Sequence, residues 1–230
     1  MHAGMNKIIR IFFLFLLTFP CAYSSAEQTG GCHCFRDRVY NPADRFVSDS
    51  YLLTTVFNSL TADFFSIAKR QIIMLKMKGG VQNDDLLIGL YISKNTGIEV
   101  TELLAGKNTR AWQQVLAEIT VPDSFLQDKW YSRMLKGLPD RESAEDITGE
   151  ILSSRFGVTH KDVWEIVHQG YSLREVALIF TLAEHAHIAP EMISSQYRIN
   201  DLSWSEIAHN FGLEPAAVGK LAGKPASKQQ

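Results

Sequence analysis

A short pattern that recurs about every 30 residues constrains the fold of this chain more than any other feature. The pattern is a glycine, an aliphatic residue, four variable positions and a second aliphatic residue. It begins at Gly97, Gly157 and Gly212, with the glycine replaced at His187, and more loosely at Ser66. Glycine readily adopts the left-handed backbone conformation that ends a helix, and the next helix then begins two or three residues later. Each copy therefore predicts a pair of short helices.

A second pattern marks helix starts between these turns. It is a serine followed three residues later by an acidic residue and then by a β-branched residue, and it occurs at 143–147, 172–176 and 203–207. The serine oxygen accepts a hydrogen bond from an amide at the helix start, and the acid accepts one from the serine amide. A weaker copy at 111–115 lacks the serine. The pattern predicts capped helices that start at these positions.

The two patterns together predict an all-α domain over 51–222. Apolar residues from Tyr51 onward recur at spacings near three and four, and no long stretch alternates with the period of a strand. A pair of short helices cannot bury its apolar face alone, so neighbouring pairs must stack. We expect tandem two-helix repeats of roughly 30 residues, forming either a short α-solenoid or an orthogonal helical bundle. The copy around 127–142 is degenerate.

Residues 1–26 have the features of a cleavable signal peptide. Lys7 and Arg10 precede the apolar run 11–19, Pro20 breaks it, and small residues lead to a cleavage site after Ala26. This run is too short for a membrane span, which needs about 20 apolar residues. We expect export to the periplasm or the exterior and no transmembrane span in the mature protein. An irregular arm is expected over 27–50 and a disordered tail over 223–230.

The net charge does not favour nucleic acid as a partner. It is −2 for the whole chain, and cleavage after Ala26 would make it −4 because Lys7 and Arg10 are lost without any acidic residue. A mildly acidic protein has no overall attraction for nucleic acid or anionic lipid. We therefore expect a protein partner and no nucleic-acid partner.

One segment nevertheless resembles a DNA-binding motif. Residues 203–218, with Glu206-Ile207-Ala208 followed by Gly212, resemble the helix-turn-helix of bacterial regulators and sigma-like factors. The resemblance implies a second helix that reads bases, which requires Arg, Lys, Asn or Gln on its exposed face. The expected second helix, 214–220, carries only Lys220 of these types. We interpret the segment as a packing unit.

The candidate reactive site is Cys32-His33-Cys34 in the arm. Cys21 would leave with the signal peptide, so these are the two cysteines of the mature chain. Two thiolates one residue apart can hold copper or contribute to a zinc site, with further ligands from elsewhere. They can also form a strained disulfide with redox activity, or an inert disulfide that fixes the arm. The sequence leaves these alternatives open.

A weaker metal hypothesis rests on two Glu-x-x-His pairs, Glu165 with His168 and Glu206 with His209. Each pair shares one helix face, and two such pairs help to build di-iron sites in helical bundles. Against this hypothesis, Glu206 already belongs to a predicted helix cap. The four tryptophans follow helical stripes and are expected in the core. No catalytic motif is recognisable, so no catalytic residue and no cofactor other than copper or zinc at Cys32 and Cys34 is predicted.

Three hypotheses about function follow. The first is an exported helical-repeat protein that acts as a binding or scaffold module in the cell envelope and not as an enzyme. The second is a periplasmic redox or metal-handling protein that uses Cys32, His33 and Cys34. The third is a helix-turn-helix nucleic-acid binder, which export of the chain would contradict.

Overall fold

A computed structural model describes residues 37–223 of the chain, and within that range the predicted all-α fold is confirmed, with no strand. Residues 37–48 form turns that lead into the first helix. The helices are α1 (Asp49–Phe64), α2 (Lys69–Gly79), α3 (Asn83–Thr96), α4 (Val100–Lys107), α5 (Trp112–Glu118), α6 (Asp123–Leu126), α7 (Lys129–Leu135), α8 (Asp140–Phe156), α9 (His160–His168), α10 (Leu173–Ala186), α11 (Pro190–Arg198), α12 (Trp204–Asn210) and α13 (Pro215–Ala222). Among these helices none has the length and apolar character needed to cross a membrane.

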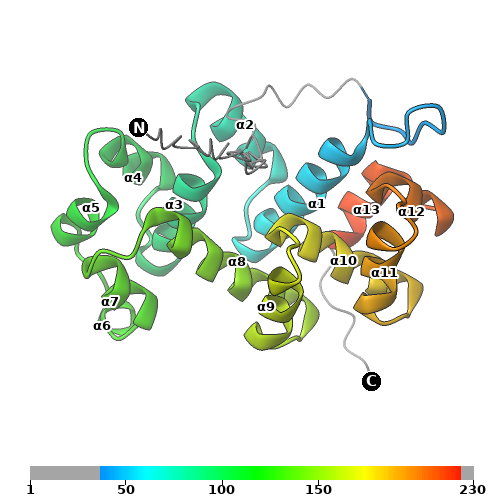
Figure 1. Cartoon of the computed structure of the whole chain (residues 1–230). Helices are drawn as coiled ribbons and strands as arrows, with labels where there is room; N and C mark the ends of the chain where they lie inside the picture. The colour runs from blue at the N-terminus through cyan, green and yellow to red at the C-terminus, as the bar shows by residue number, and fades with distance from the viewer. Residues whose placement is uncertain (1–36, 224–230) are drawn as a thin grey trace, which may run out of the picture.

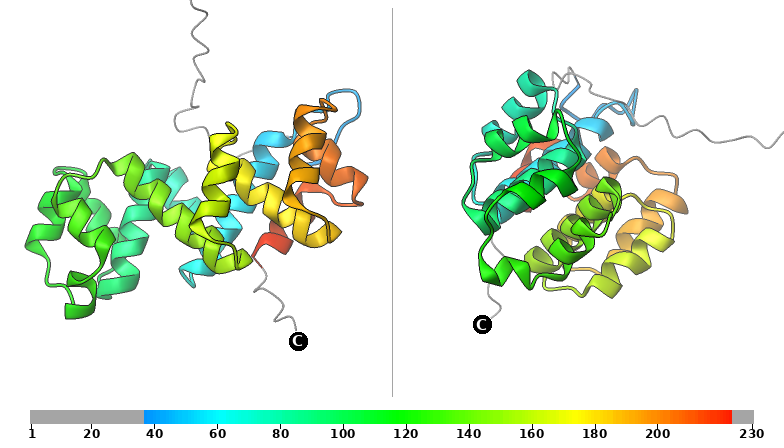
Figure 2. Two further views of the ribbon diagram at one scale, coloured as in Figure 1. Left: turned by 60° about the horizontal axis from the view of Figure 1, so that its bottom comes forward. Right: turned by 90° about the vertical axis from the view of Figure 1, so that its left-hand side faces the viewer.

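The helices form an elongated body whose first and last helices pack against each other. Helices α3–α7 gather at one end and α9–α13 at the other, with α1 and α8 between them (Figures 1 and 2). Helix α1 packs against α13 most extensively, and also contacts α2, α8, α10 and α12. An open stack of repeats would keep its first and last units apart. This arrangement therefore closes on itself.

The predicted left-handed turns are confirmed at every position named from the sequence. The backbone φ angles are 77° at Gly97, 68° at Gly157, 73° at Gly212, 55° at His187 and 53° at Ser66. In each case the next helix begins three residues later. The second aliphatic residue of each pattern is buried, at most 2% exposed: Ile72, Leu103, Val163, Ile193 and Val218. The spacing thus sets both the turn and the residue that fixes the second helix to the core.

Two of the predicted helix caps are confirmed. Ser172 and Ser203 each accept a hydrogen bond from the amide three residues on, and Glu175 and Glu206 accept from the serine amides. The weaker copy keeps half of the arrangement, because Gln114 accepts from the amide of residue 111. A further cap of the same kind, at 159–162, was not predicted; there the acid is an aspartate.

The cap predicted at Ser143 is wrong. Helix α8 begins at Asp140, and its N-cap is Pro139, whose extended backbone directs the chain into the helix. Ser143 therefore lies inside the first turns, where it is fully buried and its hydroxyl has no hydrogen-bond partner among residues 37–223. Asp146, the acid of the expected cap, pairs instead with Arg133. Asp140 and Glu142 place acidic side chains in the first turn, where the helix dipole favours them, and this supports the earlier start.

The expected core role of the tryptophans is confirmed for Trp112, Trp130 and Trp204, which are at most 7% exposed. Trp164 is half-buried. The indole N–H of Trp112 donates to Asp85 over 2.9 Å, and that of Trp204 donates to Glu175 over 3.1 Å. These bonds satisfy polar atoms that burial would otherwise leave unpaired.

Candidate functional site

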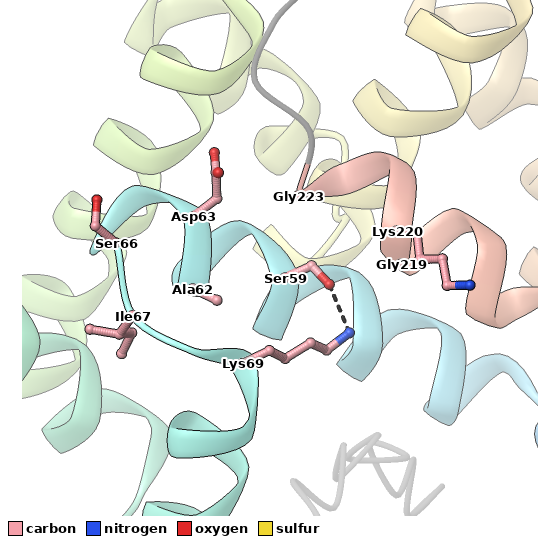
Figure 3. Close-up of a pocket in the computed structure, with 9 residues that line it drawn as sticks. All are labelled: Ser59, Ala62, Asp63, Ser66, Ile67, Lys69, Gly219, Lys220 and Gly223. Carbon is pink, nitrogen blue, oxygen red and sulfur yellow. Dashed lines mark hydrogen bonds between the residues drawn. The ribbon is translucent and has the colours of Figure 1, made fainter.

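A pocket of about 500 Å³ opens where α1, the turn into α2, and the end of α13 meet (Figure 3). It is lined by Ser59, Ala62, Asp63, Ser66, Ile67, Lys69, Gly219, Lys220 and Gly223. The lining combines two lysines, two serine hydroxyls and one carboxylate with small apolar surfaces. Such a mixture of polar and apolar groups suits a small polar ligand.

Glycines in α13 and directly after it bring this helix close to α1. A Cβ atom at Gly219 would lie 2.8 Å from the side chain of Thr55, and one at Gly223 would lie 3.4 Å from Ser59. A side chain at Gly219 would push the helices apart, whereas a Cβ atom at Gly223 would make an ordinary van der Waals contact. The close approach places Lys220 in the lining of the same pocket as Lys69.

Lys69 lies at the centre of this arrangement. Its Nζ donates to the carbonyl oxygen of Thr55 at 2.8 Å, to the hydroxyl of Thr55 at 2.6 Å and to the hydroxyl of Ser59 at 2.7 Å. All three acceptors are neutral, and among the described residues Lys69 forms no ion pair. Burial lowers its pKa to about 8, because an ammonium without a counter-charge is poorly stabilised away from water.

Lys76, two turns further along α2, has a similar environment outside the pocket. Its Nζ donates to the amide oxygen of Asn58 at 2.8 Å. Burial, and to a smaller degree the nearby guanidinium of Arg174, lowers the pKa of Lys76 to about 7. Two partly buried cations of α2 are thus held by neutral groups of α1.

The arm before α1 is fixed by contacts with α12 and with the turn that precedes it. Arg45 forms an ion pair with Asp201 at 2.6 Å, and its backbone carbonyl accepts from the hydroxyl of Ser205 at 2.8 Å. Asp49 accepts from the amides of Trp204 and Ser205, so it stabilises the start of α12 from another helix. Burial raises the pKa of Asp49, although the hydrogen bonds from Ser205 oppose this shift.

Large apolar side chains are exposed along this arm and the turn that it binds. Phe46 is 47% exposed, Val39 is 61% exposed, and Ile199, in the turn between α11 and α12, is 79% exposed. The guanidinium of Arg45 lies 4.9 Å from the ring centre of Phe46 while it binds Asp201, two residues beyond Ile199. We call Val39, Phe46 and Ile199 the arm surface.

The cysteine site predicted from the sequence, Cys32, His33 and Cys34, lies outside the described residues. Tyr40, in the described part of the arm, is held by two contacts. Its amide donates to Glu214 at 3.3 Å, and the ring of Tyr40 packs against the ring of His209 with 4.7 Å between the ring centres. His209 and Glu214 are themselves 3.6 Å apart.

The residues of the two Glu-x-x-His pairs lie on separate helices, α9 and α12, and have other partners. Glu165 pairs with Lys161 at 3.5 Å, and Glu206 caps α12 and lies 3.8 Å from Arg45. The ring of His168 lies 6.4 Å from that of Trp164. Within residues 37–223 no three His, Cys, Asp or Glu side chains are grouped so that they could hold a metal ion.

The helix-turn-helix-like segment forms α12, the turn at Gly212 and α13. Val218, Gly219 and Ala222 of α13 are buried, and α13 packs against α1. Its exposed positions are Ala216 and Lys220. The face of α13 that remains accessible therefore carries one side chain capable of reading a base.

The lysine pocket was missed from the sequence, although two signals point toward it. Residues 69–79 contain four basic residues and no acidic residue, and Lys69 and Lys76 share a helix face because they are seven positions apart. Polar Thr55, Asn58 and Ser59 form a stripe on α1 that would otherwise be apolar. That the two faces meet is a property of the tertiary packing.

Comparison with families of proteins, with curated proteins and with solved structures finds no match to this chain.

Proposed function

We propose that this protein is an exported helical module of the cell envelope that acts by binding a protein partner. The observation that carries this proposal is the arm surface, where exposed Phe46 follows Arg45 and exposed Ile199 lies two residues before Asp201, the two partners of an ion pair. Apolar side chains next to paired charges are typical of recognition surfaces. This ion pair holds the surface in place, which lowers the entropic cost of association.

In this proposal the surface is presented by a scaffold of repeated two-helix units. Five turns each contain a residue in the left-handed conformation, and in each the next helix begins three residues later. This regularity supports one repeated unit. Export after cleavage at Ala26 remains part of the proposal, since residues 1–26 lie outside the described range.

Capture from envelope extracts tests the proposal. We expect the wild-type protein to retain a partner. Ile199→Asp should lower the affinity for this partner at least about tenfold, because a charge would have to be buried at the contact. Leu126→Asp is the matched control: Leu126 is 48% exposed on α6 at the other end of the body. Equal losses with both variants, or no partner with the wild type, would contradict the proposal.

A second candidate is a redox or metal-handling role for Cys32, His33 and Cys34. It rests on the two closely spaced cysteines of the sequence, which could hold copper or zinc or form a redox-active disulfide. Replacing both cysteines with Ser separates the candidates. Loss of bound copper or zinc, or of disulfide exchange, with partner capture retained would assign these cysteines a separate role. Unchanged metal content and exchange would eliminate that role.

The third candidate is a nucleic-acid binder that uses α12 and α13. Its one exposed basic side chain on α13 provides little for base reading. An intact mass that begins at Glu27 in protein isolated from the envelope would eliminate it, because the chain would then be separated from the chromosome.

A further inference from the structure

We propose that the pocket between α1, α2 and α13 binds a small oxyanion, a phosphate or carboxylate group, through the ammonium of Lys69. This inference is independent of the proposed partner and of the arm surface. It assigns a ligand site to a part of the fold in which the sequence shows no recognisable motif.

The first argument is the missing counter-charge. The ammonium of Lys69 is withdrawn from water and uses its three hydrogen bonds on a carbonyl and two hydroxyls, with no carboxylate paired to it within the described chain. Buried charges in folded proteins are usually paired, because neutral acceptors do not replace the hydration that is lost. An oxyanion is a stronger acceptor than any of the three neutral groups. Binding of an oxyanion would therefore supply the negative charge that no described residue provides to Lys69.

The second argument is the lining around this ammonium. Lys220 supplies another cation, and Ser59 and Ser66 supply hydroxyls. Asp63 is the one carboxylate among the nine lining residues, so the lining contains two cationic side chains and one anionic side chain. This excess suits a ligand with one net negative charge.

The third argument is that the pocket has room for more than a bare ion. Its volume of about 500 Å³ lies within the range of small-molecule sites. Ala62, Ile67, Gly219 and Gly223 provide small or apolar walls. The site therefore fits a small organic acid or a phosphate monoester, with the oxyanion placed at Lys69.

Calorimetric titration of the full chain at pH 7 tests the proposal, with inorganic phosphate and acetate as separate probes and chloride at matched ionic strength as the blank. We expect at least one oxyanion to bind, and Lys69→Met to weaken it at least tenfold, because the variant keeps the apolar stem and loses the charge. Lys76→Met is the control, since Lys76 lies on the same helix outside the pocket lining. Whichever probe binds identifies the oxyanion group.

A second measurement needs no variant. NMR titration of the lysine side chains, with and without the oxyanion that binds, measures their pKa values. In the presence of the oxyanion the pKa of Lys69 should rise from about 8 toward its ordinary value, while the pKa of Lys76 stays unchanged. The proposal is overturned if neither oxyanion binds beyond the chloride blank. It is also overturned if binding leaves the titration of Lys69 unchanged, because the site would then lie elsewhere.

Discussion

Lys76 donates to Asn58 in a partly buried position where no carboxylate of the described chain pairs with it. Its pKa of about 7 lies below the value of 10.5 for an exposed lysine, so between these pH values the folded protein binds fewer protons than the unfolded chain. The free energy of unfolding therefore rises with pH across this window. The stabilisation is complete above pH 10.5 and is lost as the pH falls through 7.

Replacing Lys76 with Met should flatten this dependence, by up to about 1.4 kcal/mol per pH unit for one proton. Urea denaturation at several pH values between 7 and 10 measures the slope. Lys78→Met, an exposed position on the same helix, should keep the wild-type slope. Indistinguishable slopes for wild type and Lys76→Met would show that Lys76 does not titrate in this window.

At the scale of helices and turns, the serine caps can be compared within one chain. Ser172→Ala removes a side chain that caps α10, and should lower the free energy of unfolding by about 1 kcal/mol. Ser143→Ala removes a buried hydroxyl inside α8 that has no partner in the described part of the chain, and should leave stability unchanged or slightly raised. Chemical denaturation gives both values. A comparable loss at Ser143 would mean that its hydroxyl has a partner in solution.

The turns and helix caps also show what the sequence could and could not predict. The turns at Gly97, Gly157 and Gly212 follow from local backbone preference, and their predicted conformations are confirmed. The left-handed turn at His187 was also predicted, because the spacing around it is the same as around the glycines. The predicted cap at Ser143 was wrong because acidic Asp140 and Glu142 favour an earlier helix start, and local rules do not rank two competing starts.

The binding pocket was beyond such local rules. Lys69 lies fourteen residues from Thr55, and Gly219 is much further along the chain, so their meeting depends on how α2 and α13 pack on α1. Thr55 and Ser59 are polar residues at buried positions of α1, and only the packed structure shows that the ammonium is their partner. A pattern of period 3.6 identifies a helix face without identifying what covers it.

At the scale of the whole molecule, Arg155 of α8 joins segments that are far apart in the sequence. It is buried, donates from Nε to the carbonyl of Ala222 at 3.1 Å and from Nη2 to that of Leu221 at 3.3 Å, and forms two hydrogen bonds with Glu184 of α10. A cation here satisfies carbonyls at the end of α13 that have no partner within that helix. Arg155 thus holds the last helix in place.

Arg155→Met should therefore lower the free energy of unfolding by about 3 kcal/mol, because buried acceptors lose their donor. Arg141→Met on the same helix, where an exposed arginine pairs with Glu145, should change it by less than about 1 kcal/mol. Thermal and urea denaturation of both variants measure the difference. Equal, small effects would show that the end of α13 is held by apolar packing alone.

The packing of α1 against α12 and α13 also determines when the core can form during synthesis. Asp49 and Trp204 are joined by a hydrogen bond although they are 155 residues apart in the chain. Contacts of such long range form late, since the intervening chain must first be available. For much of its synthesis the chain therefore has α1 without its main partner. The fold described here cannot be completed until α13 has been made, and the export that we propose would gain time from this delay.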